Sequence, residues 1–226
     1  MRPMHTGPET VEQAIAVQES LRSQVDTAGP GPQQPRYVAG LDVAYAGDEF
    51  AAAVVVLDGL EVVDRAVVLG RTAFPYVPGL FAFREVPGLL TALERLRTTP
   101  ELLVCDGQGL AHPRRFGLAC HLGVVTGLPS VGVAKTAFVG TWQEPGPRRG
   151  DASELLLDGE VVGKALRTQN KTKPVFVSVG HRVDLATAVA RVLDLTPRYR
   201  LPETTRAADR VCRQALKDSQ DEETAR

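Results

Sequence analysis

The chain has 226 residues, of which 43% are hydrophobic and 23% are charged, and its formal net charge is −1. These values are typical of one large soluble domain and exclude disordered and fibrous classes. No apolar run reaches the roughly 20 residues of a membrane helix, and the N-terminus lacks the apolar core of a signal peptide. Three cysteines in apolar surroundings predict reduced packing residues. We therefore expect one cytoplasmic, monomeric domain over residues 1–226 that does not enter membranes.

Basic residues are gathered into two segments of the chain. Neither residues 107–143 nor residues 161–183 contain an aspartate or a glutamate, whereas both carry several basic side chains. A near-neutral protein of this kind can present one basic face that follows the phosphates of a nucleic acid. The alternative is that these charges belong to ordinary solvated surfaces.

The first half of the chain predicts a helix followed by an antiparallel meander. Residues 8–26 have apolar positions near helical spacing, and a linker rich in proline and glycine follows at 29–35. Turns at Gly47-Asp48 and Asp58-Gly59 then separate three runs rich in β-branched residues, at 37–45, 51–57 and 61–69. The middle run hardly alternates, which predicts burial on both faces of a sheet.

The second half predicts alternating helices and strands. A helix at 81–97, interrupted at Pro87, precedes a β-α-β unit made of a strand at 102–105, a helix at 116–126 and a strand at 130–133. The remaining expectations are an exposed loop at 140–151, strands at 161–166 and 175–179, helices at 185–193 and 204–216, and a disorder-prone tail at 217–226. Together these elements predict an α/β fold with a mixed central sheet flanked by helices.

Two aspartates stand alone in strongly apolar stretches. Asp42 interrupts the run at 37–45, and Asp106 closes the run that begins at Leu102. A carboxylate held against a buried strand needs a cation, a hydrogen-bond partner or a raised pKa, and neither stretch has a basic residue beside it. Two strands that deliver such acids to one spot would form a divalent-metal site. The alternatives are a hydrogen-bonded buried acid at 42 and a helix cap at 106.

The segment after Asp106 supplies glycines and then bases. Glycines at 107 and 109 allow the backbone to come close to a ligand, and His112, Arg114 and Arg115 follow within a few residues. This order suits binding of phosphate and metal, because open sheets bind ligands at the carboxyl ends of their strands. Lys135 follows the strand at 130–133, where it faces a phosphate or merely extends its ammonium group into solvent.

A stiff loop precedes the helix at 81–97. Pro75 and Pro78 fix φ on both sides of Tyr76, and Gly79 closes the turn. Such a loop is either a surface turn or a wedge that pushes an aromatic ring between stacked bases. Glu85 lies near the start of the following helix, where its charge suits the helix dipole.

These motifs occur in an order that resembles the endonuclease V, or deoxyinosine 3′ endonuclease, family. The resemblance extends from about residue 11 to residue 211, and its most specific part is the Pro-Tyr-x-Pro-Gly loop followed by Phe-Arg-Glu. The matching segments are 38–43, 75–79, 83–85, 106–109, 112–115, 132–135, 180–183 and 199–203. Two positions depart from the family pattern: Gln108 stands where some relatives have histidine, and Thr136 where a second lysine often follows Lys135.

The resemblance implies a ribonuclease H-like fold and a DNA repair nuclease that depends on magnesium, with manganese as a substitute, and recognises hypoxanthine. It implies hydrolysis of the second phosphodiester on the 3′ side of the lesion, which leaves 3′-hydroxyl and 5′-phosphate ends. Lys135 and His112 would face the substrate backbone or the reacting centre. By motif match, the metal ligands would be Asp42, Glu85 and Asp106, with Asp209 as a further acid of less defined role.

The basic segments and the stiff loop lead to a hypothesis for how nucleic acid is handled. Arg114, Arg115 and residues 164–173 would hold phosphates without sequence preference. Tyr76, supported by Pro75, would enter the base stack, and the hypoxanthine nucleotide would turn out into a pocket. The candidate pocket residues, chosen because glycine permits close backbone approach, are Gly79, Phe81, Gly117 and Leu118.

Two other functions remain open at this level. One is a ribonuclease H-like nuclease with another target, such as inosine-containing RNA, RNA–DNA hybrids or branched junctions. The other is a non-catalytic reader of inosine-containing nucleic acid, which the intact set of acids argues against. In each case the expected partner is nucleic acid.

Overall fold

The computed structural model describes residues 7–224 of the chain. Its strands, in chain order, are β1 (Tyr37–Ala46), β2 (Glu49–Asp58), β3 (Glu61–Arg71), β4 (Leu102–Asp106), β5 (Ser130–Ala134), β6 (Thr141–Trp142), β7 (Ala152–Leu157), β8 (Glu160–Leu166) and β9 (Val175–His181). Its helices are α1 (Val11–Arg22), α2 (Ala82–Glu94), α3 (Leu118–Thr126), α4 (Leu185–Asp194) and α5 (Glu203–Thr224). Within these described residues, nine strands form one sheet in the order β3-β2-β1-β4-β5-β9-β8-β7-β6.

The sheet is mixed because two kinds of connection build it. Tight turns at Gly47 and Gly59, which have φ values of 62° and 61°, join β1, β2 and β3 into the predicted antiparallel meander. Crossovers through α2 and α3 then place β4 parallel to β1 and β5 parallel to β4. The pairings from β5 through β9, β8 and β7 to β6 are antiparallel.

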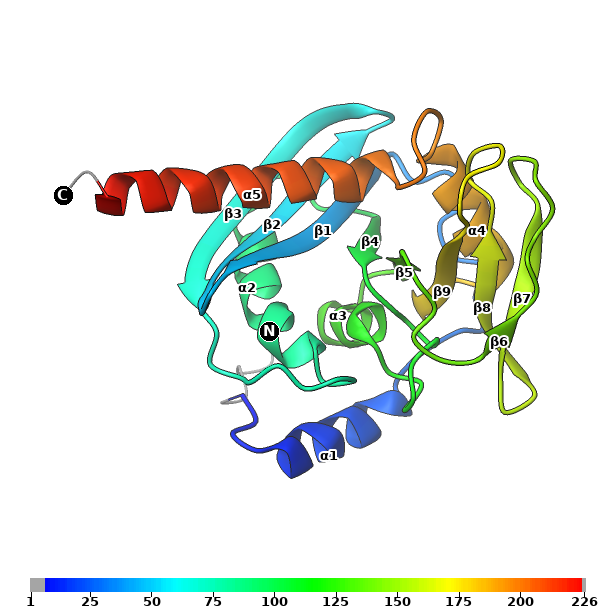
Figure 1. Cartoon of the computed structure of the whole chain (residues 1–226), viewed down its shortest axis with the longest axis horizontal. Helices are drawn as coiled ribbons and strands as arrows, with labels where there is room; N and C mark the ends of the chain where they lie inside the picture. Colours follow the sequence, from blue (N-terminus) through cyan, green and yellow to red (C-terminus); the bar gives the residue numbers. More distant parts are fainter. Residues whose placement is uncertain (1–6, 225–226) are drawn as a thin grey trace.

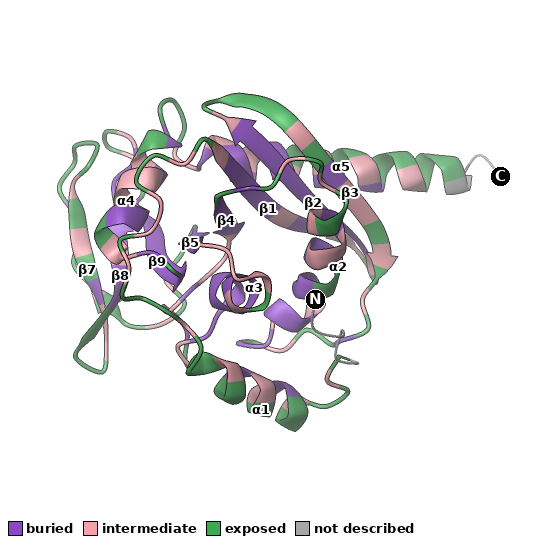
Figure 2. Cartoon of the chain, turned by 180° about the vertical axis from the view of Figure 1, so that it is seen from behind, coloured by how far each residue is buried: buried purple, intermediate pink, exposed green. Residues whose placement is uncertain are grey.

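Helices cover both faces of this sheet (Figure 1). On one face, α2 and α3 pack apolar side chains such as Leu89 and Leu122 against β1, β2 and β4. On the other face, α5 packs on β2 through side chains such as Ala208, and α4 packs on β9. β2 is buried along nearly its whole length, as predicted, whereas the edge strand β3 is largely exposed (Figure 2).

The first turn of α5 lies directly on β1. A β-carbon at Gly40 would overlap the backbone of Thr204, so only glycine permits this approach. Further along the helix, the thiol of Cys212 lies 3.1 Å from the carbonyl oxygen of Asp42. These contacts fix α5 along β1, and with it the position of Asp209 on the same helix.

Two predicted helices differ from their expected bounds. α1 covers Val11–Arg22, which is shorter than the predicted 8–26. Pro87 lies inside α2 and does not interrupt it. The helix continues because burial of its apolar face, including Val86 and Leu89, stabilises it more than one missing backbone hydrogen bond weakens it.

Two further differences concern the C-terminal half. The predicted loop at 140–151 contains the short strand β6, and β7 follows it where no strand was predicted. α5 continues to Thr224, so the described part of the segment predicted as a disorder-prone tail is helical. There Gln214 donates to the carboxylate of Asp218 at 2.7 Å, a side-chain pair one helical turn apart.

The remaining expectations from composition concern cysteines and membranes. Cys105, Cys120 and Cys212 are free, buried thiols, in agreement with their predicted role in packing. Between residues 7 and 224, none of the helices combines the length and the apolar character that a membrane crossing needs.

Replacing Gly40 with alanine should weaken the docking of α5 on β1. The added methyl group forces one element to move, and overpacking of this kind typically costs about 1–3 kcal/mol. Chemical denaturation should therefore show a lower free energy of unfolding. Gly29→Ala is the matched control, because a β-carbon at Gly29 meets its nearest atom at 4.0 Å. Equal unfolding free energies for the two variants would show that α5 is not held in this way.

Candidate active site

Asp42 and Asp106 stand at the same level on two neighbouring parallel strands. β1 pairs with β4 in a register that sets Leu41 opposite Cys105, so the next residue of each strand is one of the two aspartates. Adjacent strands lie about 4.8 Å apart, and residues at the same level point to the same face. Both aspartates are half-buried. The register therefore brings together two acids that are far apart in the sequence.

Two helices add carboxylates to this pair. Glu85 lies in the first turn of α2 and is only 3% exposed, and the hydroxyl of Tyr45 donates to its Oε1 at 3.4 Å. Asp209 lies on α5, the helix docked along β1. The charges of Asp106 and Asp209 both act on Asp42, and those of Asp42 and Asp106 act on Glu85. Acids from β1, β4, α2 and α5 thus share one electrostatic environment.

Crowding of these carboxylates disfavours their ionised forms. Burial, reinforced by the charges of Asp106 and Asp209, raises the pKa of Asp42 to about 7. Burial and the charges of Asp42 and Asp106 also raise the pKa of Glu85 well above its usual range. A cation among these groups would lower both values, because an opposite charge favours the ionised form. The site therefore gains free energy by binding positive charge.

Lys135 already supplies one positive charge. It directly follows β5, and its ammonium nitrogen lies 2.6 Å from Oδ2 of Asp106. The sequence stretch of Asp106 contains no basic residue, so its partner comes from the end of the neighbouring strand. Burial acts to lower the pKa of Lys135, but the hydrogen bond and the charge of Asp106 outweigh burial and raise it. Because the Lys135 side chain is 50% exposed, its charge is also available at the edge of the sheet.

The donor set fits a hard divalent cation such as Mg²⁺, which takes carboxylate oxygens as ligands. Asp42, Glu85 and Asp106 would hold the ion, with Asp209 beside them. Among residues 7–224, no three aspartate, glutamate, histidine or cysteine side chains are placed to hold a metal ion as they stand. Asp106 is paired with Lys135 instead, so the carboxylates would have to draw together around an ion. The suitability of the site for a divalent cation therefore depends on its carboxylate oxygens and on the repulsion between them.

A pocket of about 250 Å³ lies next to the loop that follows Asp106. It is smaller than the roughly 300–1,000 Å³ sites of drug-sized ligands and suits one small planar group. Its walls include five of the residues predicted to handle a base: Tyr76, Gly79, Phe81, Gly117 and Leu118. The other lining residues are Gln18, Pro78, Ala82, Gly107, Gln108, His112 and Phe138. Pro75 precedes this set and does not line the pocket.

The carbonyl oxygen of Gly79 holds the proline-flanked loop in place. It accepts hydrogen bonds from Nε2 of Gln18 at 3.0 Å, Nε2 of His112 at 2.9 Å and Nη2 of Arg114 at 2.7 Å. Gly79 has a φ of 80°, which favours glycine, and a β-carbon there would lie 2.9 Å from Arg114. Tyr76, by contrast, is 70% exposed. The loop is thus anchored at its end while its aromatic side chain stands in solvent.

His112 supports this loop through both of its ring nitrogens. Its Nδ1 accepts the backbone N–H of Arg114 at 3.2 Å, so the proton of the neutral ring must lie on Nε2, which donates to Gly79. Burial, reinforced by the charge of Arg114, lowers the pKa of His112 to about 4. Both ring nitrogens therefore help to hold the loop, and the catalytic role expected of His112 stays a prediction.

The two arginines expected to contact phosphates have partners inside the protein. Besides its bond to Gly79, Arg114 donates from Nε to Oε1 of Gln18 at 2.5 Å. Nη2 of Arg115 donates to the carbonyl oxygen of Leu157 at 2.9 Å and pairs with Glu160 at 3.2 Å. These bonds give both guanidinium groups a structural role, and their predicted contacts to phosphates stay a prediction.

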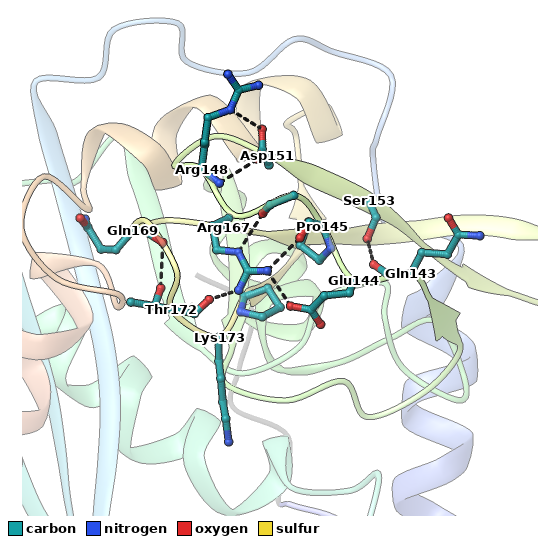
Figure 3. Close-up of polar contacts among 12 residues, drawn as sticks. Gln143, Glu144, Pro145, Arg148, Asp151, Ser153, Arg167, Gln169, Thr172 and Lys173 are labelled. Atoms are coloured by element: carbon teal, nitrogen blue, oxygen red, sulfur yellow. Dashed lines mark hydrogen bonds and ion pairs between the residues drawn. The ribbon is translucent and has the colours of Figure 1, made fainter.

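The predicted basic segment at 164–173 is also partly neutralised. Arg167 points between two loops, where it pairs with Glu144 at 2.6 Å and donates to the carbonyl oxygen of Pro145 at 2.8 Å (Figure 3). Lys164 pairs with Glu154 at 3.2 Å. Lys173 is exposed, and its side chain extends away from the Arg167 network (Figure 3). Part of the positive charge of this segment therefore braces loops.

Comparison with known proteins agrees with this arrangement. Residues 19–210 match the family model described as Endonuclease V. The endonuclease V of Nocardia farcinica is 65% identical over 216 residues, which cover 94% of this chain and 95% of that protein. The chain belongs to the endonuclease V family. It is therefore an endonuclease, of a family that is metal-dependent in general.

Solved endonuclease V structures share the fold. The crystal structure from Streptomyces avermitilis has a TM-score of 0.92 at 56% identity and covers 95% of this chain and 96% of that one. A Ciona intestinalis endonuclease V has a TM-score of 0.80 at 27% identity, covering 93% of this chain and 99% of that one. That protein was solved with a 24mer DNA containing an inosine followed by a ribo-adenosine. The predicted ribonuclease H-like fold, a mixed sheet flanked by helices, is confirmed.

Sequence reasoning missed parts of the endonuclease V pocket wall. Gln18 is only 1% exposed, yet it stands on a helix whose neighbouring polar residues are exposed, so its sequence context carries no signal. Phe138 is 44% exposed, and its ring centroid lies 5.7 Å from that of His112. Phe138 could have been predicted, because a large aromatic residue in the short loop after β5 and Lys135 is an unusual feature of the sequence.

Asp42→Asn should stabilise the metal-free protein at neutral pH. The pKa of Asp42 is raised to about 7 from an unfolded value near 3.8, so the stability from its neutral form is complete below about pH 3.8 and is lost as pH rises towards 7. The variant should therefore have a higher melting temperature at pH 8, by about 2–4 °C for each kcal/mol relieved, and little advantage at pH 4.

Thermal melts with and without Mg²⁺ complete this measurement. Mg²⁺ should raise the melting temperature of the wild type at pH 8 more than that of Asp42→Asn, because the variant has lost one charged ligand. Asp218→Asn, on the distal part of α5, is the matched control and should behave like the wild type. A lower melting temperature for metal-free Asp42→Asn at pH 8 would contradict the proposed repulsion.

Proposed function

We propose that this endonuclease recognises hypoxanthine in nucleic acid and, with Mg²⁺ bound, hydrolyses the second phosphodiester bond on the 3′ side of the lesion. The products are a 3′-hydroxyl and a 5′-phosphate, as in repair of deaminated adenine. Inosine-containing DNA is the proposed substrate. The Ciona intestinalis complex, in which a ribo-adenosine follows the inosine, supports testing inosine in RNA beside it.

The observation that carries this proposal is the continuity of the pocket with the acids. Gly107 and Gln108 line the pocket, and they directly follow Asp106 in the chain. A base seated in the pocket therefore places its own strand beside the carboxylates. Because the pocket and the acids are adjacent but separate, this arrangement supports cleavage of a bond away from the recognised nucleotide.

Base recognition is assigned to the walls of the pocket. Tyr76, exposed at the pocket rim, enters the stack and compensates for the base that leaves it. Within residues 7–224, Oε1 of Gln108 is a buried acceptor without a hydrogen-bond partner in the protein. Hypoxanthine carries a proton on N1, whereas adenine presents an acceptor there, so this oxygen, once turned towards the pocket, would favour the deaminated base. A guanine amino group would need further space and a further acceptor.

The residues of the acid site act on the phosphate. Bound Mg²⁺ would supply a Lewis acid that lowers the pKa of water and neutralises charge on the phosphoryl oxygens. Asp42, Glu85 and Asp106 would hold and orient the ion. Lys135, kept at the sheet edge by Asp106, places an ammonium group where negative charge develops during displacement. The proposed role of His112 is to hold the loop that carries Tyr76.

Incision assays test the reaction directly. Single-stranded DNA and RNA, each with one inosine, should be cut in the presence of Mg²⁺, and mapping of the DNA products should place the cut at the second bond on the 3′ side. Asp106→Asn should lower the rate by at least about a hundredfold, because it removes a metal ligand. Matched adenine and guanine strands should remain uncut. Equal cleavage of inosine and adenine strands would refute recognition of hypoxanthine.

Tyr76→Ala should weaken binding to inosine DNA by about tenfold or more, because aromatic stacking contributes about 1–3 kcal/mol per base. Binding is measured by fluorescence anisotropy in the Asp42→Asn background, which should bind without cutting. Tyr76→Phe keeps the ring and should retain most of the affinity. If Tyr76→Ala weakens binding to inosine DNA and undamaged DNA equally, Tyr76 is a loop residue without a wedge role.

A further inference from the structure

Arg200, in the connection between α4 and α5, gathers three carbonyl oxygens beside the active site. Its Nη2 donates to the carbonyl oxygens of Lys135 at 2.7 Å and Pro174 at 2.8 Å, and its Nε donates to that of Lys173 at 2.9 Å. The acceptors belong to two segments, one that follows β5 and one that precedes β9. The guanidinium group therefore ties the ends of two strands to the segment that leads into α5.

Arg200 is itself firmly held. Its own carbonyl oxygen accepts from the hydroxyl of Thr168 at 2.7 Å, and the neighbouring carbonyl oxygen of Tyr199 accepts from Gln169 at 3.3 Å. A planar guanidinium group presents its donors in fixed directions, so binding several carbonyl groups fixes their relative positions. α5, which carries Asp209, begins at Glu203, so this anchor is also close to the start of that helix.

Lys135 is the point where the Arg200 anchor meets the carboxylates. The pairing of β5 with β9 ends at Ala134, so Lys135 is the first residue beyond that ladder. Arg200 donates to the backbone carbonyl oxygen of Lys135, and the ammonium nitrogen of Lys135 lies 2.6 Å from Asp106. A lysine side chain has much rotamer freedom to lose, so it keeps one position more readily when its backbone is fixed.

We propose that Arg200 is a positioning residue that holds Lys135 against Asp106. Arg200 acts through the backbone of Lys135, and Lys135 alone carries the effect to the phosphate. The effect on strand cleavage rests on the proposed function of the site. The effect on the placement of Lys135 does not depend on any activity, so the two are tested separately.

Chemical labelling tests the placement of Lys135. Metal-free protein is treated with trace acetic anhydride at pH 8, and the acetylation of Lys135 is measured by peptide mass spectrometry against that of the exposed Lys217. An ammonium group paired with Asp106 reacts slowly, because the ion pair shields it from the reagent. Arg200→Ala should increase the relative acetylation of Lys135 several-fold. Unchanged acetylation would overturn the proposal, whether or not the protein cuts inosine strands.

A double-mutant cycle tests the effect on cleavage. Arg200→Ala should lower kcat on inosine DNA by about tenfold with little change in KM, because misplacement of a group that acts in the transition state lowers kcat. In the Lys135→Ala background, the same change should have no further effect. Multiplicative losses would show that Arg200 acts on its own and would overturn the proposal. Absence of inosine cleavage by the wild type would refute the proposed function and leave the labelling result to decide.

Two further variants separate positioning from charge and from folding. Arg200→Lys keeps the positive charge but loses the fixed donor directions of the guanidinium group, so it should remain folded and still show raised acetylation of Lys135. Acetylation of Lys135 at the wild-type level in Arg200→Lys would mean that charge alone matters. Arg149→Ala is the matched control, because Arg149 also binds backbone carbonyls nearby, those of Thr168 and Leu193. It should leave the acetylation of Lys135 unchanged. An equal rise in Arg149→Ala would reduce the role of Arg200 to general bracing.

Discussion

The register between β1 and β4 is the constraint on which the active site depends. It sets Asp42 beside Asp106, and a slip of one residue would turn one of them to the opposite face of the sheet. The apolar neighbours Leu41 and Cys105 are fully buried in the core, so the packing that stabilises the fold also fixes the acids. Gly40 then allows α5 to approach β1 closely, which brings in the acid on that helix. Core packing and placement of the acids are therefore not separable properties of this sheet.

A second constraint, the hydrogen bonds to the carbonyl oxygen of Gly79, shapes the pocket. The carbonyl oxygen of Gly79 draws hydrogen bonds from Gln18, His112 and Arg114, which come from α1 and from the loop after β4. Side chains used in this way keep a stiff loop in one place, so its aromatic ring can be exposed without the loop being mobile. In the proposed function, recognition and catalysis use different groups: backbone and pocket walls for the base, and carboxylates with Lys135 for the phosphate.

The sequence allows prediction of features that depend on local pattern. A lone acid in a buried run is readable without neighbours, so Asp42 and Asp106 could be singled out, as could the meander and the β-α-β unit. The hydrogen-bond partners of side chains cannot be predicted in this way. Arg114 donates to Gln18, which is 96 positions away in the sequence, so a guanidinium group that looks unpaired in the sequence is hydrogen-bonded in the fold. β7 was missed for a different reason. The Asp158-Gly159 turn that joins it to β8 repeats the Asp-Gly turn signal of residues 58–59, but β7 itself carries polar residues and so lacks the apolar pattern of a buried strand.

The charges of the acid site favour the binding of a metal ion. Lys135 pairs with Asp106 and Arg213 pairs with Asp209, whereas none of the ion pairs among the described residues involves Asp42 or Glu85, so repulsion among the four carboxylates is only partly compensated. The repulsion lowers the stability of the metal-free fold, and a divalent cation returns that free energy when it binds, because the ligand binds the folded state alone. Replacing the acids with amides would relieve the repulsion but would also remove what attracts the ion. The same side chains thus reduce the stability of the metal-free fold and supply affinity for the cation. A fold with a large apolar core remains stable in spite of this repulsion.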